Sequence, residues 1–327
     1  MIFLSIDGGA SRTRGVLFTE DGEVRCYQET EAASLSRPDV DSPRILGNFI
    51  QEIALQAELG LKELDLVNVG VAGVSNLDAR ERLFRELDRL DLSDRAIVTS
   101  DVEAAYEVIW EDAQGVLVCV GTGAIGWARD EQGNTYRASG RGPQLDGDKG
   151  SGYWLGKTAI VHLIMNEGIE ADDLIDLRRK VLETYAAESV EEAAQIAGDV
   201  KDMISSTARL GQVICDLAEK GNDIALAMLQ EGTQGLADEL LHMIEEAGLY
   251  SDRIYIGING GIIVNSDIYR QLLADALSYD LPNISWRLPE INPVFGAGLI
   301  AARLNRIAVN LDSLKKSWSE KYVLSQR

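Results

Sequence analysis

The sequence predicts a mixed α/β protein, and three observations support this class. Apolar strand patterns alternate with helical patterns in the N-terminal third, a strand-turn-strand hairpin occurs twice, and a long helical region follows the second hairpin. The chain has 327 residues, of which 46% are hydrophobic. This length is sufficient for two domains with apolar cores.

The first hairpin lies between Ile2 and Val24. An apolar run ends in Asp7-Gly8-Gly9-Ala10-Ser11-Arg12-Thr13-Arg14-Gly15, and a second apolar run follows. Glycines let the backbone turn sharply and approach a ligand, while the hydroxyls and arginines of this segment suit phosphate. The carboxylate of Asp7 would repel bare phosphate, so we expect it to hold the water shell of a Mg²⁺ ion bound to a nucleotide. Taken alone, the stretch is also typical of an ordinary glycine-turn hairpin, which is the more common occurrence.

The next segments alternate between strand and helix patterns. They are a third strand at 22–27, a helix at 45–59, a buried strand at 66–73, a helix at 78–90 and a short strand at 96–99. Asp101 follows, where this strand stops and another helix begins. Open α/β sheets place their chemistry at such strand ends. Asp101 is therefore either a functional carboxylate or the N-cap of the helix, and spacing does not decide between them.

The second hairpin repeats the pattern of the first. An apolar strand at 115–120 leads into the turn Gly121-Thr122-Gly123 and a second strand. Gly15 is followed by Glu20 and Gly22, and Gly126 is followed by Glu131 and Gly133 at the same spacings. Two such hairpins facing each other would clamp a triphosphate through backbone N–H groups and the Thr122 hydroxyl.

A glycine-rich loop from Gly140 to Gly152 contains Arg141 and Asp148 and leads into a helix. Its shape suits a small polar ligand. Two motif matches in this region are rejected. Residues 151–158 lack the first glycine and the preceding strand of a P-loop, and the segment from Asp146 lacks the glycine and final glutamate of a calcium loop.

Residues 153–248 have mostly helical patterns, including amphipathic runs at 200–218 and 224–244. A strand at 253–258 then ends in Asn259-Gly260-Gly261, where a diglycine opens a helix. This arrangement fits either the approach of a flat ring or phosphate, or a close-packed turn. Residues 293–302 predict a helix of small residues that packs closely on a sheet.

Composition and charge exclude several classes of function. The formal net charge of −22 argues against nucleic-acid and anionic-membrane partners, because both require a basic face. The chain has no long apolar run and no signal peptide, so we expect a cytoplasmic protein. The three scattered cysteines, Cys26, Cys119 and Cys215, predict no disulfide, zinc or iron–sulfur site. The basic residues from Lys315 to Arg327 are expected to form a solvated tail.

In order and spacing, these segments resemble the actin/hexokinase superfamily, and within it the N-acetylglucosamine kinase branch of the BadF/BadG/BcrA/BcrD ATPase family. The matching motifs are Asp7-Gly8-Gly9-x-x-x-Thr13, Ser100-Asp101, Gly121-Thr122-Gly123, Gly147-Asp148-x-Gly150-Ser151-x-Tyr153-Trp154, Asn259-Gly260-Gly261 and Pro293-Val294-Phe295-Gly296-Ala297. They extend over nearly the whole chain. Each motif is weak alone, but six in order are fairly specific.

The resemblance implies two ribonuclease H-like domains of the actin/hexokinase type with a nucleotide cleft between them. Their expected ranges are 1–112 plus 292–327, and 113–291 with a helical insertion. It also implies an ATP-dependent sugar kinase acting on N-acetylglucosamine or glucosamine, as a homodimer. The cofactors would be ATP and Mg²⁺.

The resemblance also implies roles for individual residues. Asp101 would be the general base, and Asp7 would hold Mg²⁺ through water. Phosphate and nucleotide contacts would come from Gly8, Gly9, Ser11, Thr13, Gly121, Thr122, Gly123, Gly260 and Gly261. Sugar contacts would come from Gly140, Arg141, Asp148 and Thr122.

Two departures from the family pattern leave alternatives open. Lys149 and Arg141 stand where relatives have Glu and often Trp. They would suit a sugar that bears a carboxylate, such as N-acetylmuramate, or they are ordinary surface cations. Two further alternatives are an ATPase that activates a partner enzyme, which the scattered cysteines disfavour, and a nucleotide-binding regulator without kinase activity.

Overall fold

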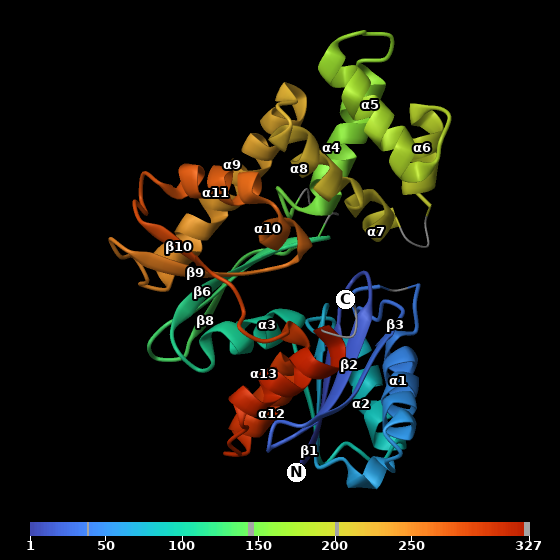
Figure 1. Ribbon diagram of the computed structural model, residues 1–327, viewed down its shortest axis with the longest axis vertical. Helices are drawn as coiled ribbons and strands as arrows, with labels where there is room; N and C mark the ends of the chain where they lie inside the picture. The colour runs from blue at the N-terminus through green and yellow to red at the C-terminus, as the bar shows by residue number, and fades with distance from the viewer. Residues whose placement is uncertain (38, 143–146, 200–202, 324–327) are drawn as a thin grey trace. The chain divides into compact units, whose positions relative to one another are not determined.

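The computed structural model describes residues 1–37, 39–142, 147–199 and 203–323 (Figure 1). The chain divides into two compact units. Unit 1 comprises residues 1–111 and the chain from residue 289 onward, and unit 2 comprises residues 112–288. Each unit contains a five-stranded sheet with helices, which confirms the predicted α/β class.

The sheet of unit 1 has the strand order β3-β2-β1-β4-β5. Its strands are β1 (Ile2–Gly8), β2 (Thr13–Thr19), β3 (Val24–Thr30), β4 (Leu66–Val71) and β5 (Ala96–Thr99). β1 pairs antiparallel with β2 and parallel with β4, and β5 extends the parallel part. β1, β4 and β5 therefore end at the same edge of the sheet.

Helices cover both faces of this sheet. They are α1 (Ser42–Gln56), α2 (Leu77–Arg89), α3 (Asp101–Trp110), α12 (Gly296–Leu304) and α13 (Leu311–Trp318), with short turns at η1 (Leu61–Glu63), η3 (Pro293–Phe295) and η4 (Ser319–Val323). Side chains alternate along β1, so Leu4 and Ile6 pack against α1 and α2, whereas Phe3 packs towards Phe295. Figure 1 shows α1 and α2 on one side of the blue strands and α12 and α13 on the other.

The sheet of unit 2 has the order β10-β9-β6-β7-β8. Its strands are β6 (Gly115–Val120), β7 (Ala124–Arg129), β8 (Thr135–Ser139), β9 (Ile254–Asn259) and β10 (Ile284–Arg287). β6 pairs antiparallel with β7 and parallel with β9. The topology is that of unit 1, with β6 in the place of β1.

The helices of unit 2 build one large apolar core with its sheet. They are α4 (Gly152–Met165), α5 (Asp172–Tyr185), α6 (Val190–Ala197), α7 (Met203–Ala208), α8 (Leu210–Glu219), α9 (Asp223–Glu246), α10 (Gly261–Asn265) and α11 (Asp267–Leu277). The predicted helical region is confirmed, although residues 200–202 at the start of one run lie outside the described residues.

The two hairpins also share the way in which one glycine of each packs against a helix. Gly15 and Gly126 each lie in the second strand of a hairpin and face a covering helix. A Cβ added at Gly15 would lie 2.2 Å from Ile53 Cδ1 of α1, and one at Gly126 would lie 2.4 Å from Leu240 Cδ2 of α9. The sequence repeat therefore has a structural cause, because both helices need a glycine beneath them.

The C-terminal segment corrects the expectation of a solvated tail. Leu314 of α13 is fully buried. The ring of Trp318 lies 5.2 Å from that of Phe295 and 5.0 Å from that of Tyr27. Leu311, Leu314 and Trp318 recur at helical spacing, so this helix presents an apolar side to the sheet although its lysines are charged. Residues 324–327 lie outside the described residues.

None of the helices within the described ranges is long and apolar enough to cross a membrane.

Candidate active site

Two carboxylates of unit 1 lie at the same edge of its sheet. In the strand pairing, Asp7 of β1 is level with Gly70 of β4, which is level with Thr99 of β5. Asp101 follows directly after β5 and begins α3. Because neighbouring strands lie about 4.8 Å apart, the backbones of β1 and β5 are separated by about 10 Å. The two acids therefore border one region at the carboxyl edge of the parallel strands, where ligands of such sheets bind.

Ser100, and not Asp101, caps the start of α3. The Ser100 hydroxyl accepts a hydrogen bond from the Glu103 N–H at 3.1 Å. The Glu103 carboxylate accepts the N–H and the hydroxyl of Ser100, both at 2.8 Å. This reciprocal capping box satisfies the helix start. The N-cap interpretation of Asp101 is therefore wrong: the half-buried Asp101 occupies the first helical position, and its role as a base stays a prediction.

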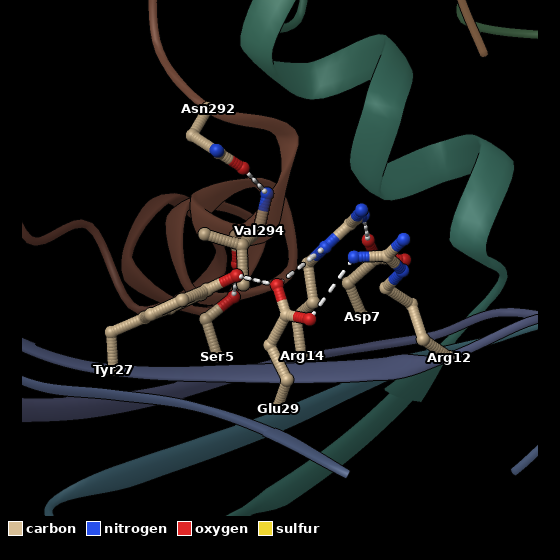
Figure 2. A network of polar contacts seen from close by, with 8 residues as sticks. All are labelled: Ser5, Asp7, Arg12, Arg14, Tyr27, Glu29, Asn292 and Val294. Carbon is tan, nitrogen blue, oxygen red and sulfur yellow. Dashed lines mark hydrogen bonds and ion pairs between the residues drawn. The ribbon is translucent and has the colours of Figure 1, made fainter. Parts of the chain in front are cut away.

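A ladder of charged side chains holds Asp7 (Figure 2). Asp7 of β1 is level with Arg14 of β2, which is level with Glu29 of β3. Arg14 Nη1 lies 3.5 Å from Asp7 Oδ2, and Arg14 Nε lies 3.5 Å from Glu29 Oε1. Burial raises the pKa of Asp7, and the charge of Arg14 opposes this rise. Arg14 thus offsets part of the burial penalty on the charged Asp7 carboxylate, whose side chain is 20% exposed.

Glu29 also engages two further side chains. Arg12 Nη1 lies 3.1 Å from Glu29 Oε2, and the Tyr27 hydroxyl donates to Glu29 Oε1. The hydrogen bond from Tyr27 is the main reason why the pKa of Glu29 lies below its usual value. The two arginines that sequence reasoning offered to phosphate are therefore already paired with carboxylates. Figure 2 shows these side chains converging above the strands.

The turn between β1 and β2 consists of residues 9–12, and the N–H of Gly9 donates to the Arg12 carbonyl at 3.0 Å. Gly8 ends β1 and pairs with Thr13. Thr13 is fully buried, and its hydroxyl has no hydrogen-bond partner in the described ranges. Ser11 is exposed. Of the two hydroxyls that this hairpin was predicted to offer to phosphate, only that of Ser11 is accessible in this conformation.

The turn between β6 and β7 is fixed by a helix. The carbonyl of Gly121 accepts the N–H of Gly152 at 2.8 Å, and the carbonyl of Thr122 accepts the N–H of Tyr153 at 3.1 Å. Both donors belong to the first turn of α4, whose N–H groups have no partner within the helix. Gly121, Thr122 and the exposed Gly123 are thus held by backbone contacts.

Asp148 connects the predicted sugar-site loop to this turn. It is 8% exposed, and its Oδ1 accepts the N–H of Gly142 at 3.1 Å. A Cβ added at Gly123 would lie 3.0 Å from Asp148 Oδ2. Burial raises the pKa of Asp148, and the N–H groups of Gly142, Ala124 and Arg141 oppose this rise. A contact between Asp148 and a sugar stays a prediction; Asp146, where the rejected calcium-loop match begins, lies outside the described residues.

The two glycines after β9 have different surroundings. Gly260 has φ +96°, and a Cβ there would lie 2.4 Å from the carbonyl oxygen of Val120. The fold therefore requires glycine at this position. At Gly261, a Cβ would meet no atom within 4 Å. The missing side chain of Gly261 leaves open space at the start of α10, as a ring approaching the backbone would need.

The sequence motifs did not indicate the capping role of Ser100, nor the roles of Glu29, Ser139 and Glu239. The capping box Ser100-x-x-Glu103 was readable from spacing alone. Glu29 carried only a weak signal, the alternation of polar and apolar residues in β3. Glu239 accepts the N–H of Ser139 at 2.9 Å across 100 residues of sequence, a pairing that no local pattern announces.

The family model of the BadF/BadG/BcrA/BcrD ATPases matches residues 4–301. The chain belongs to the BadF/BadG/BcrA/BcrD ATPase family. This membership agrees with the resemblance stated from the motifs, and the matched range contains every predicted site residue.

Two curated relatives are similar to this chain along nearly their whole length. An N-acetylmuramic acid/N-acetylglucosamine kinase of Clostridium acetobutylicum is 24% identical over 302 residues, which are 91% of this chain and 97% of the relative. An N-acetyl-D-glucosamine kinase of Dictyostelium discoideum is 24% identical over 312 residues, which are 92% and 97% of the two chains.

The fold also matches a solved structure. A Chromobacterium violaceum protein assigned as an N-acetylglucosamine kinase superposes with a TM-score of 0.72 at 21% identity, over 92% of this chain and 98% of that chain. At this identity the likeness supports the fold.

Proposed function

We propose that this protein is an ATP-dependent kinase that phosphorylates a hydroxyl of an amino sugar, N-acetylglucosamine or glucosamine. The observation that carries the proposal is the placement of Asp7 and Asp101 at one edge of the unit 1 sheet. Family membership and the names of the relatives support ATP and an amino sugar as the substrates. Phosphoryl transfer requires alignment, charge neutralisation and a carboxylate near the attacking oxygen.

Asp101 is the proposed general base. It takes the proton from the sugar hydroxyl as the oxygen attacks the γ-phosphorus and the bond from that phosphorus to the β,γ-bridging oxygen breaks. A base must stay ionised and accessible, and Asp101 is half-buried at the N-terminus of α3. Because Ser100 and Glu103 complete the cap, the helix start does not require the Asp101 carboxylate.

Asp7 fits a magnesium ion held through water. Mg²⁺ keeps several water ligands and commonly uses one or two carboxylates together with substrate phosphates. Asp7 presents one partly exposed carboxylate, which Arg14 stabilises in its charged form. When bound, the ion neutralises the charge of the β- and γ-phosphates.

The remaining proposed contacts belong to unit 2. Backbone N–H groups of the Gly121–Gly123 turn other than that of Gly121, which donates to the Gly123 carbonyl at 2.9 Å, bind phosphate oxygens together with the Thr122 hydroxyl. Gly261 offers open backbone to adenosine. Asp148 and Arg141 are assigned to the sugar. Arg141 is exposed, and the curated bacterial relative is named for N-acetylmuramic acid as well as N-acetylglucosamine. A carboxylate-bearing sugar is therefore a second candidate substrate.

The test measures ADP release from MgATP over N-acetylglucosamine, glucosamine, N-acetylmuramate and glucose. We expect turnover to require an amino sugar and Asp101→Asn to lower kcat by about 100-fold or more, the contribution typical of a general base. Asp94→Asn is the matched control, because Asp94 precedes β5 at the opposite edge and its side chain is 75% exposed. It should retain wild-type kcat.

Two results would contradict the proposal. ATP turnover that needs no sugar and survives Asp101→Asn would favour an ATPase. Tight sugar binding without ADP formation would favour a regulator.

A further inference from the structure

The chain makes an unusual turn directly after β8. Ser139, Gly140 and Gly142 have φ values of +56°, +69° and +83°. Left-handed backbone is costly for a residue with a Cβ, so Ser139 keeps this conformation only where its surroundings fix it. Ser139 is 4% exposed, and its hydroxyl has no hydrogen-bond partner among the described residues. The groups that fix this turn must therefore act on its backbone.

Two charged side chains do so. Glu239 of α9 accepts the N–H of Ser139 through Oε2 at 2.9 Å. Arg137 of β8 donates from Nε to the carbonyl of Ser139 at 3.2 Å and from Nη2 to the carbonyl of Gly140. Hydrogen bonds that involve an ionised group are stronger than neutral ones. The Glu239 carboxylate thus binds the N–H at the start of the turn, and the Arg137 guanidinium binds the carbonyls of Ser139 and Gly140.

The turn leads directly to residues assigned to the sugar. After Ser139 and Gly140 comes the exposed Arg141, and the N–H of Gly142 donates to Asp148 Oδ1 at 3.1 Å. Asp148 Oδ2 lies next to Gly123 in the turn after β6. A continuous set of contacts therefore connects Glu239 on α9 with Asp148.

We propose that Glu239 and Arg137 are positioning residues of the sugar site. They set the turn from Ser139 to Gly142, and through it the placement of Arg141 and Asp148. This inference rests on the proposed function. Neither residue contacts substrate: each acts by holding the backbone that carries the substrate-binding groups.

A purely structural clamp makes a different prediction. If Glu239 only stabilised the end of β8, its loss would lower the fraction of folded protein, and kcat would fall while both KM values stayed constant. Loss of positioning instead raises KM for the sugar and leaves KM for ATP unchanged. The split between the two KM values separates these cases.

The kinetic experiment compares three variants of the full chain. Glu239→Ala should raise KM for the amino sugar about tenfold, because it leaves the buried Ser139 N–H without its acceptor. Glu239→Gln keeps an acceptor oxygen and should stay within about threefold of wild type. Glu231→Ala changes an exposed residue of the same helix and should match wild type. An unchanged sugar KM in Glu239→Ala, or equal changes in both KM values, would overturn the proposal.

Hydrogen exchange provides a readout that needs no activity. In the protein without substrates, the Ser139 amide should exchange at least about tenfold faster in Glu239→Ala than in wild type, and near the wild-type rate in Glu239→Gln. If wild type phosphorylates no sugar but the exchange pattern is as expected, the proposed function fails, while the hydrogen bond by which Glu239 holds the Ser139 turn is supported. Equal exchange of the Ser139 amide in all variants would show that Glu239 does not hold this turn.

If Glu239→Ala fails to fold, Arg137→Met tests the other half of the pair. It should raise sugar KM and exchange at Gly142 in the same way, and wild-type values for both would overturn the proposal.

Discussion

The two hairpins place equivalent rows of residues at the ends of their first strands, and these rows differ in chemistry. In unit 1 the row is Asp7, Arg14 and Glu29. In unit 2 it is Cys119, Ile125 and Ser139. The first row is a ladder of charges, whereas the second carries no charged side chain and obtains its acid, Glu239, from a helix.

This difference shows that the fold sets the positions of the two hairpin turns, whereas the side chains set which ligand each turn suits. The shared topology brings both hairpin turns to comparable positions in their sheets. The charged row of unit 1 suits a divalent cation, and the backbone-held turn of unit 2 suits phosphate oxygens.

The glycine at the strand end lies on the first hairpin strand in unit 1 but after the neighbouring parallel strand in unit 2. In unit 1, Gly8 ends the first strand and lies beside Val71. In unit 2, Val120 ends the first strand, and Gly260 follows the neighbouring strand β9. The two positions are closed in different ways: a Cβ at Gly8 would meet the side chain of Val71, whereas a Cβ at Gly260 would meet the backbone of Val120.

Gly260→Ala should have the largest effect on stability. It would combine left-handed backbone with a Cβ 2.4 Å from the Val120 carbonyl oxygen, so we expect a loss of about 3 kcal/mol or more in the free energy of unfolding. Gly8→Ala, with a Cβ 3.0 Å from Val71 Cγ2, should cost about 1 kcal/mol. Urea unfolding of the full chain measures both, and equal losses would show that the two edges are packed alike.

Asp7→Asn should have the largest effect on activity within the two rows. If Asp7 holds magnesium through water, its loss should lower kcat with MgATP by about 100-fold, the upper end of effects seen for outer-sphere groups. Cys119→Ser changes the equivalent residue of unit 2 and should stay within about twofold of wild type. Similar losses in the two variants would contradict the division of roles between the rows.

Glu29→Gln should have the smallest effect, and the effect should depend on pH. The folded-state pKa of Glu29 is lowered, first by the Tyr27 hydrogen bond, so its contribution to stability is present above its ordinary pKa of 4.5 and is lost as pH falls through the folded-state value. Because the side chain is 41% exposed, we expect less than about 1 kcal/mol at neutral pH. The difference in Tm between wild type and Glu29→Gln should shrink below about pH 4.5, and a constant difference would contradict this account.

Much of the fold could be predicted from local pattern. Apolar runs predicted strands at 66–73, 96–99 and 115–120, and the structure has β4 at Leu66–Val71, β5 at Ala96–Thr99 and β6 at Gly115–Val120. The repeat around Gly15 and Gly126 was visible because both glycines meet the same demand. By contrast, the edge strand β10 was missed, since its Ile284-Ser285-Trp286 segment is too short to stand out.

Less of the site could be predicted. The position of Asp101 after β5 followed from alternation, but the capping role went to the residue before it. The enclosure of the Thr13 hydroxyl and the pairing of Arg12 with Glu29 depend on how three strands align. Such contacts join residues that sequence spacing does not relate, so motif reasoning identified the turns but not the groups that hold them.

Ser100 and Glu103 cap the start of α3 without the Asp101 side chain, and this has a practical consequence for experiments. Replacements such as Asp101→Asn or Asp101→Cys leave both capping partners unchanged, so the altered chain should still assemble this helix. A chemically silent yet correctly assembled protein of this kind would be a suitable crystallographic trap, able to accumulate nucleotide and acceptor together without consuming either. A thiol at that position would also accept electrophilic sugar analogues and report directly which alcohol is presented to it.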